Sequence, residues 1–245
     1  MTVTDVNVVK SAIFERPDDA NKGTLGSLLC VCGSYGMAGA AVMSAKGALR
    51  TGIGLAKCAL PRSIYPIVAQ TILESVYYPL SENADGRISK VNVPFLVSES
   101  CKSSATLVGC GLGVCDDTLK IVFSFIENST TPLVLDADAL NCVAKQPEIL
   151  LRKKAPIIIT PHPGEMSRLT GLATPLVNAE RERVALDFAQ KYGVVTVLKG
   201  AGTVIASPNG KVLVNPTGNS GMATGGSGDA VSYTHLRAHE TSQDL

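Results

Sequence analysis

The sequence predicts an α/β fold in which a mostly parallel central sheet carries helices on both faces. Three observations support this fold class. Short apolar runs alternate with helical segments, as in sheets joined by crossover helices. Polar and glycine-rich turns follow the apolar runs, so they should gather at the carboxyl ends of the strands, where such sheets bind ligands. A length of 245 residues with 45% hydrophobic content suits one domain.

The first half of the chain reads as three buried strands and two helices. Gly33 ends the first strand, and Gly52 ends a helix rich in alanine and methionine. Segment 64–76 fits either a helix or a strand, and the composition of 81–86 indicates a loop. The expected strands are 28–32, 55–60 and 105–108, and the expected helices are 38–50 and 116–127.

The second half continues the alternation and ends in a hairpin. A turn at 199–203 leads into this hairpin, whose tip is expected around 208–210 because Pro-Asn-Gly favours a tight reversal. The expected strands are 133–135, 157–160 and 194–198, and the expected helices are 139–144 and 178–192.

The composition excludes several classes of protein. The net charge is +1 and no lysine or arginine cluster stands out, so neither nucleic acid nor a membrane surface is an expected partner. Seven cysteines, mostly within apolar runs and without zinc-ligand spacing, are expected in the core of a protein from a reducing compartment. No secretion signal or 18-residue apolar stretch is found, which predicts a cytoplasmic protein acting on small molecules.

The stretch 215–229, NPTGNSGMATGGSGD, is the strongest single candidate for chemistry. It holds five glycines, which allow several N–H groups to converge on one anion. Asp229 would lie at the rim of that anion-binding nest, where a carboxylate can take a proton from a hydroxyl that attacks phosphorus. A glycine-rich surface loop, with Asp229 as a helix N-cap, is the alternative.

Six segments in this order resemble the ADP/ATP-dependent NAD(P)H-hydrate dehydratases of the ribokinase-like superfamily. They cover roughly residues 22–229. The segments are KGTLGSLLCVCGSYGMAGAAVMSAKGALRTGIGL, VGCGLG, PLVLDADALN, ITPHPGEMSRLTG, VTVLKGAGTVI and NPTGNSGMATGGSGD. The resemblance implies an enzyme that uses ADP or ATP to phosphorylate the ring hydroxyl of hydrated NADH or NADPH and then eliminates phosphate.

The resemblance also implies roles for particular residues. Asp229 would be the catalytic base, and the amides of Gly226, Ser227 and Gly228 would hold the transferring phosphoryl group. His162 would bind the hydrate, although it could instead be a satisfied histidine in a rigid proline turn. Substrate-pocket positions implied by the resemblance, for which backbone packing is a compatible reading, are Ala40, Gly111 and Gly113, with Asp229.

A second set of residues would serve the nucleotide. A lysine in the turn 199–203 can neutralise phosphate charge, although a Lys-Gly pair can also simply mark the end of a helix or strand. The amide and hydroxyl groups after 214 can contact the nucleotide. Glu165 could orient Mg²⁺ or its waters, or it could cap the helix that follows. Asp136, Asp138 and Asn141 face the same cleft and could position metal or substrate through water. The nucleotide-binding set is Lys199, Gly200, Ala201, Gly202, Thr203, Asn215, Thr217, Asn219 and Gly228.

The chain departs from the family pattern in two places. Cys110 stands where the family usually has proline, which should only soften a turn. The tail 232–245 is polar and resembles adapter read-through, so we expect one domain over 1–231 and do not count His235 or His239 as ligands. The family further implies a homotetramer. An NAD(P)H-hydrate epimerase, fused in many relatives, would here be a separate chain.

Two other functions fit the same motifs. A kinase for a vitamin precursor would release a phosphorylated product, but such kinases usually carry asparagine where this chain has His162. A nucleotide-binding protein without activity is the second alternative, through truncation or evolved loss. His162 and the segment GSYGMAGAA favour the dehydratase.

Overall fold

The computed structural model describes residues 2–3, 18–222 and 225–226. Its strands are β1 (Thr2–Val3), β2 (Ser27–Val31), β3 (Leu55–Pro61), β4 (Val76–Leu80), β5 (Ala105–Val108), β6 (Leu133–Leu135), β7 (Ile157–Ile159), β8 (Val195–Leu198), β9 (Thr203–Ala206) and β10 (Val212–Asn215). Its α-helices are α2 (Ala38–Thr51), α3 (Tyr65–Ala69), α4 (Val93–Cys101), α5 (Asp116–Asn128), α6 (Asp138–Val143), α7 (Pro163–Thr170), α8 (Thr174–Ala179) and α9 (Arg181–Tyr192). Four short 3₁₀ segments complete the described part: η1 (Arg62–Ile64), η2 (Lys90–Asn92), η3 (Pro147–Arg152) and η4 (Ser220–Met222).

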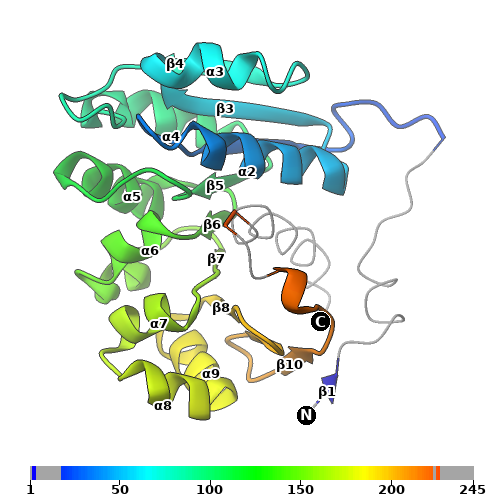
Figure 1. The fold of residues 1–245 in the computed structure, drawn as a ribbon, viewed down its shortest axis with the longest axis vertical. Coiled ribbons are helices and arrows are strands. Elements are labelled where there is room, and N and C mark those ends of the chain that lie inside the picture. The colour runs from blue at the N-terminus through cyan, green and yellow to red at the C-terminus, as the bar shows by residue number, and fades with distance from the viewer. Residues whose placement is uncertain (1, 4–17, 223–224, 227–245) are drawn as a thin grey trace.

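The described strands form one sheet in the order β1-β10-β9-β8-β7-β6-β5-β2-β3-β4 (Figure 1). Strand β9 runs antiparallel to both of its neighbours, and every other adjacent pair is parallel. The predicted fold class is therefore confirmed. The predicted hairpin is confirmed as well, because β9 and β10 pair directly through the turn at 207–211.

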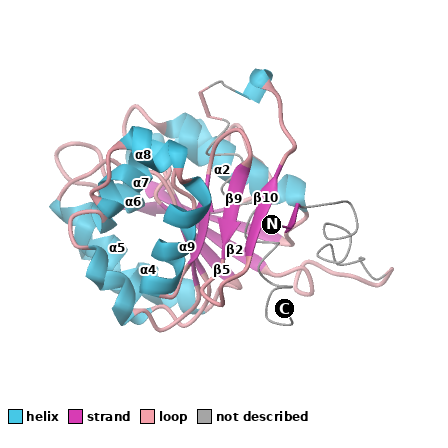
Figure 2. Cartoon of the chain, turned by 90° about the horizontal axis from the view of Figure 1, so that it is seen from below, coloured by secondary structure: helices cyan, strands magenta, loops and turns pink. Residues whose placement is uncertain are grey.

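Each face of the sheet is covered by its own apolar cluster. Helices α4 to α9 lie along one side of the strands (Figure 2) and bury Phe125, Leu140 and Phe188 against it. Helices α2 and α3 cover the other face, where Leu28 and Cys30 of β2 meet small side chains of α2. Alternate residues of the central strands thus enter opposite clusters, which explains why these strands read as continuous apolar runs.

Helix α2 lies close to the sheet because its inner side carries mostly alanine. Ala41, Ala45 and Ala48 are at most 3% exposed, and Ser44 is fully buried beside them. Gly52 ends the helix in the left-handed conformation, with φ of 99°. The start of α2 is therefore held close to the carboxyl ends of the strands beneath it.

Three parts of the chain differ from the prediction. The expected helix 178–192 is wrong as a single helix, because Glu180 leaves helical geometry and separates α8 from α9. The ambiguous segment 64–76 contains α3 and the first residue of β4. Helix α4 was missed, since VPFLVSESC lacks a clear apolar stripe.

Within the described part of the chain, no helix is both long enough and apolar enough to cross a lipid bilayer.

Candidate active site at the carboxyl edge of the sheet

The candidate segments share one edge of the sheet. Strands β2, β5, β6, β7 and β8 are parallel, so the turns after them emerge at the same edge. Thr203 begins β9 and pairs with Asn215, the last residue of β10, which brings both residues to that edge. The described parts of six motifs, far apart in the sequence, therefore meet at the carboxyl edge.

The glycine turn 109–113 packs against the start of α2. Gly111 has φ of 67°, and a Cβ placed there would lie 2.7 Å from the Cβ of Ala40. Ser34 donates a hydrogen bond to the Gly111 carbonyl at 2.7 Å. Ala40 itself is 3% exposed. The structure thus brings together two residues of the predicted substrate pocket, Ala40 and Gly111, in close backbone packing.

Gly113 is tied to the start of α6 through Asp138. Its N–H donates to Asp138 Oδ2 at 2.7 Å, and Asn141 Nδ2 donates to Asp138 Oδ1 at 3.3 Å. Arg168 of α7 extends this chain, because its Nε donates to Asn141 Oδ1 at 2.8 Å. Asp138 and Asn141 therefore brace the glycine turn against α6 and α7.

Two cations beside these turns were missed by the sequence reasoning. Arg168 is exposed and follows Glu165 by three residues, a spacing that could have indicated it. Arg87 lies against Gly113, where an added Cβ would meet its guanidinium, and it donates to the Val114 carbonyl at 3.4 Å. Nothing in the sequence around Arg87 indicates this position.

His162 and Glu165 begin helix α7 with a reciprocal capping arrangement. His162 Nδ1 accepts from Gly164 N at 3.0 Å and from Glu165 N at 3.4 Å, while Glu165 Oε2 accepts from His162 N at 2.8 Å. The Glu165 side chain is 6% exposed and that of His162 is 51% exposed. Glu165 thus caps the helix, which is one of the two roles predicted for it. One side of the His162 imidazole stays accessible to water at the edge of the sheet.

Lys199 forms an ion pair with the buried carboxylate of Asp136. Its Nζ lies 2.7 Å from Asp136 Oδ1 and 4.0 Å from Glu165 Oε2, and the exposed fractions of Lys199 and Asp136 are 17% and 1%. Its backbone N–H donates to the Pro161 carbonyl at 2.8 Å. The predicted nucleotide turn and the His162 turn are therefore joined by both backbone and charge.

The charges in this group shift one another's pKa values. Burial lowers the pKa of Lys199, but the Asp136 and Glu165 carboxylates outweigh burial and hold it above its ordinary value. Burial raises the pKa of Glu165, against the opposing effect of Lys199. Burial, Lys199 and Arg168 lower the pKa of His162, so the imidazole is neutral at pH 7. Neutrality agrees with the role of Nδ1 as an acceptor.

The turn 199–203 is held by its own groups and by Arg181. Thr203 Oγ1 donates to the Gly200 carbonyl at 3.0 Å, and Arg181 Nη2 donates to the Leu198 carbonyl at 2.8 Å. Gly200 and Gly202 have φ of 151° and 68°, which disfavour other residues. This turn forms one wall of a surface hollow of about 620 Å³.

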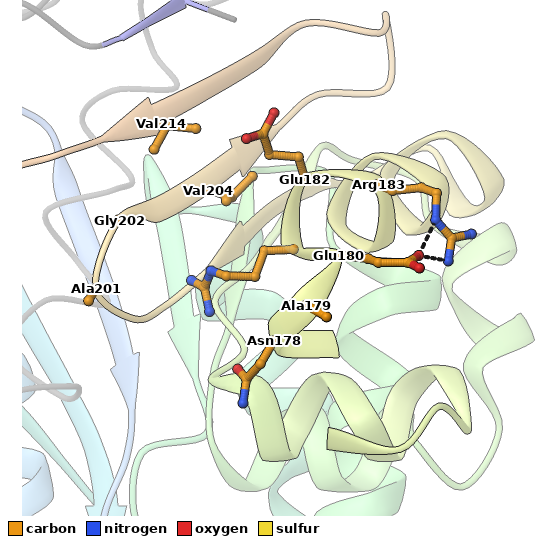
Figure 3. A pocket seen from close by; sticks show the side chains of 10 residues that line it. Asn178, Ala179, Glu180, Glu182, Arg183, Ala201, Gly202, Val204 and Val214 are labelled. Atoms are coloured by element: carbon orange, nitrogen blue, oxygen red, sulfur yellow. Dashed lines mark hydrogen bonds and ion pairs between the residues drawn. The ribbon is translucent and has the colours of Figure 1, made fainter. Parts of the chain in front are cut away.

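The hollow lies between the α8–α9 junction and the strands β9 and β10 (Figure 3). Asn178 and Ala179 face the turn residues Ala201 and Gly202 across it, and Val204 and Val214 supply apolar walls. Its size suits part of a nucleotide.

The other predicted nucleotide residues form local turns beyond β10. Asn215 Oδ1 accepts from Thr217 N at 3.1 Å and from Thr217 Oγ1 at 2.7 Å, and Asn219 Oδ1 accepts from Gly221 N at 2.9 Å. Thr217 and Asn219 are exposed. Their proposed contacts with a nucleotide stay predictions.

The nest lies partly within the described structure. Gly226 has φ of 86°, and a Cβ at this position would meet the Met43 side chain of α2. Gly226 therefore lies against helix α2. Ser227, Gly228, Asp229 and the tail 232–245 lie outside the described residues.

Two carboxylates at this edge, those of Glu165 and Asp136, already have partners within the protein. Glu165 Oε2 already accepts the His162 N–H, and Asp136 is paired with Lys199. Within residues 2–3, 18–222 and 225–226, no cluster of three acidic, histidine or cysteine side chains could hold a metal. Mg²⁺ usually takes only one or two carboxylates beside phosphate oxygens and water, so the role of Glu165 in orienting Mg²⁺ stays a prediction.

The chain has the α/β fold of ribokinase-like proteins, with the candidate residues at the carboxyl edge of the sheet. A ribokinase-like protein from Enterococcus faecalis superposes with a TM-score of 0.80 at 22% identity, covering 94% of this chain and 77% of that one. The family model described as NAD(P)H-hydrate dehydratase matches residues 28–232. The chain belongs to the NAD(P)H-hydrate dehydratase family.

Individual relatives agree with this assignment. The ADP/ATP-dependent NAD(P)H-hydrate dehydratase of Bacillus subtilis, co-crystallized with ATP and Mg²⁺, superposes with a TM-score of 0.77 at 30% identity. The match covers 95% of this chain and 79% of the Bacillus chain. The bifunctional NAD(P)H-hydrate repair enzyme of Thermofilum pendens is 40% identical over 216 residues, which are 88% of this chain and 41% of that protein. The chain thus spans less than half of the bifunctional relative.

Proposed function

We propose that this chain uses ADP or ATP to dehydrate hydrated NADH or NADPH and so restores the reduced nicotinamide cofactor. The observation that carries the proposal is the meeting of the family's motifs at one sheet edge, where the backbone of Lys199 bonds to Pro161 beside His162. The two substrates must react with each other, so their turns have to be neighbours. The coverage of the Bacillus dehydratase supports the same activity.

The proposed chemistry explains why a nucleotide takes part in a dehydration. Hydroxide is a poor leaving group and phosphate is a good one. Asp229 takes the proton of the ring hydroxyl as its oxygen attacks the terminal phosphorus, and the nucleotide loses one phosphoryl group. The amides of Gly226, Ser227 and Gly228 stabilise the charge that develops on that group. The C–O bond then breaks and phosphate leaves with its electron pair, the neighbouring ring carbon gives up a proton to water, and the double bond of the dihydronicotinamide is regained.

The described residues divide into two neighbouring sides. On the hydrate side, the glycine turn 109–113 and Ala40 supply a close-packed wall, and His162 presents the exposed side of a neutral imidazole. On the nucleotide side, the turn 199–203 contributes its backbone and Thr203. Asn215, Thr217 and Asn219 extend that side. Mg²⁺ would enter with the phosphates of the nucleotide, since it favours phosphate oxygens and water over sites made by protein groups alone, and Glu165 could orient it.

The assembly and setting of the protein are proposals of the same kind. We propose a cytoplasmic homotetramer that works together with an NAD(P)H-hydrate epimerase, which supplies the reactive form of the hydrate. Light scattering on the eluted protein would measure the oligomer, and a monomer would contradict the tetramer.

The test is the recovery of dihydronicotinamide absorbance when the purified chain is mixed with hydrated NADH, Mg²⁺ and either ADP or ATP. Recovery that depends on one nucleotide would establish both the reaction and the phosphoryl donor. A stable phosphorylated product without recovery of absorbance would instead indicate a kinase. A folded chain that binds nucleotide and yields no product would contradict the proposed activity.

A further inference from the structure

The charge balance around the turn 199–203 differs from what the sequence suggests. A lysine that begins a phosphate-binding turn is expected to face the phosphates. Here the Lys199 ammonium lies 2.7 Å from the buried Asp136 carboxylate and 4.0 Å from Glu165. Two carboxylates thus surround one ammonium, and moving Lys199 onto a nucleotide would leave buried negative charge uncompensated. The turn needs another source of positive charge.

Arg181 is the cation in the right place. It is the first residue of α9 and lines the hollow beside the turn. Its Nη2 donates to the Leu198 carbonyl, and both terminal nitrogens lie 2.9 Å from the point that a Cβ at Gly200 would occupy. The guanidinium therefore fills the space that the glycine leaves free, directly under the backbone of the turn.

Arg181 also lacks the carboxylate that its neighbours have. Arg183, two residues later, is paired with Glu180 and lies 3.5 Å from Asp187. Among the described residues Arg181 forms no ion pair, and its Nε is buried without a hydrogen-bond partner. Burial alone lowers the pKa of Arg181. It nevertheless stays protonated at pH 7, since the ordinary value is far above neutrality.

We propose that Arg181 supplies the positive charge of the nucleotide site and interacts with the anionic part of the nucleotide over the turn 199–203. This inference rests on the proposed function, because it takes the turn to be the nucleotide-binding segment. Binding an anion is especially favourable for a half-buried cation that has no acidic partner, because the free-energy cost of removing that cation from water is already present in the free protein. Lys199 then serves as an internal counter-ion for Asp136.

The test compares ADP with adenosine, which has the same base and ribose but no charged phosphates. Calorimetry on the full chain measures the affinities of ADP and adenosine for the wild type and for Arg181→Gln. We expect Arg181→Gln to lose about tenfold or more in ADP affinity, the equivalent of a charge-assisted hydrogen bond, while its adenosine affinity changes less than about twofold. Equal losses for ADP and adenosine, or no loss for either, would overturn the inference.

The controls separate charge from structure. Lys191→Gln removes an exposed cation near the other end of the same helix, away from the hollow, and should leave ADP affinity within about twofold. If Arg181→Gln does not fold, Arg181→Lys can replace it, because lysine keeps the positive charge but lacks the planar guanidinium with its paired N–H donors. Arg181→Lys should still weaken ADP more than adenosine, and an equal effect on both would reject the proposal.

The outcome also distinguishes this inference from the proposed reaction. A wild type that binds ADP but does not regenerate dihydronicotinamide would reject the reaction, while the binding data still decide the role of Arg181. A wild type that regenerates dihydronicotinamide, with an Arg181→Gln variant that binds ADP normally, would reject only the role of Arg181. A wild type that binds neither ADP nor ATP would overturn both the proposed reaction and the role of Arg181.

Discussion

Removing the Lys199 ammonium tests whether the carboxyl edge depends on an internal ion pair. In Lys199→Met, the Asp136 carboxylate stays buried at 1% exposure without its main counter-ion. Breaking a buried pair from one side typically costs 3 to 5 kcal/mol, and because the Lys199 side chain keeps 17% exposure we expect the lower end, about 3 kcal/mol. In a chain of this size that loss lowers Tm by about 6 to 12 °C.

The assay is urea and thermal unfolding followed by circular dichroism at pH 7. Lys154→Met is the matched control, since Lys154 is exposed and forms no ion pair among the described residues. Lys199→Met/Asp136→Asn removes both charges, so its loss should be smaller than the sum of the two single losses by about 1 kcal/mol or more. A Lys199→Met variant within 1 kcal/mol of the Lys154→Met control, an allowance the size of a surface effect, would refute the reasoning.

The stabilisation by the ion pair of Lys199 and Asp136 should also depend on pH. The folded pKa of Lys199 is raised, so the pair stabilises the wild type fully below the ordinary lysine pKa and this stabilisation is lost as pH rises through the raised value. Lys199→Met has no ammonium to lose, so the difference in the free energy of unfolding between the variant and the wild type should shrink as pH rises through that value. A difference that is constant from about pH 7 to about pH 11.5, a range that spans the ordinary lysine pKa, would contradict this assignment.

Three further variants test other parts of the edge. Asp229→Asn should abolish recovery of dihydronicotinamide absorbance and keep ADP affinity within about threefold, because it removes the base and preserves shape; unchanged turnover would reject Asp229 as the base. His162→Ala should raise the KM of the hydrate more than that of the nucleotide, and should cost about 1 kcal/mol through the lost N-cap; a larger effect on the nucleotide KM would place His162 on the other side. Gly109→Ala should cost about 2 kcal/mol or more in urea unfolding, because its φ is 134° and a Cβ would overlap the Asp136 carbonyl; wild-type stability would contradict this close packing.

The sequence could predict the architecture because its signals are local. Apolar runs and glycine stops mark β2, α2 and the turn 109–113, and strand direction then places the polar turns at one edge. The division between α8 and α9 was missed for an equally local reason. Residues 178–192 keep a helical pattern through Glu180, and the change in its backbone angles leaves no mark in composition.

The pairings within the site could not be predicted in the same way. Lys199 and Asp136 are 63 residues apart, and only the lateral order β6-β7-β8 brings them together. Without that pairing, Lys199 looks like a phosphate ligand and Arg181 like one charge among several on an amphipathic helix. Glu165 was predicted with two alternatives, and the reciprocal hydrogen bonds with His162 favour the cap.

The antiparallel hairpin formed by β9 and β10 offers a place to attach a probe. Both ends of the hairpin that face the carboxyl edge, Thr203 and Asn215, belong to the candidate site. Its tip at 208–210 is therefore one strand length away, at the opposite edge of the sheet, and is exposed. A fluorophore or a short epitope inserted there would report on the chain without touching either substrate side, since exposed loop tips tolerate insertion well.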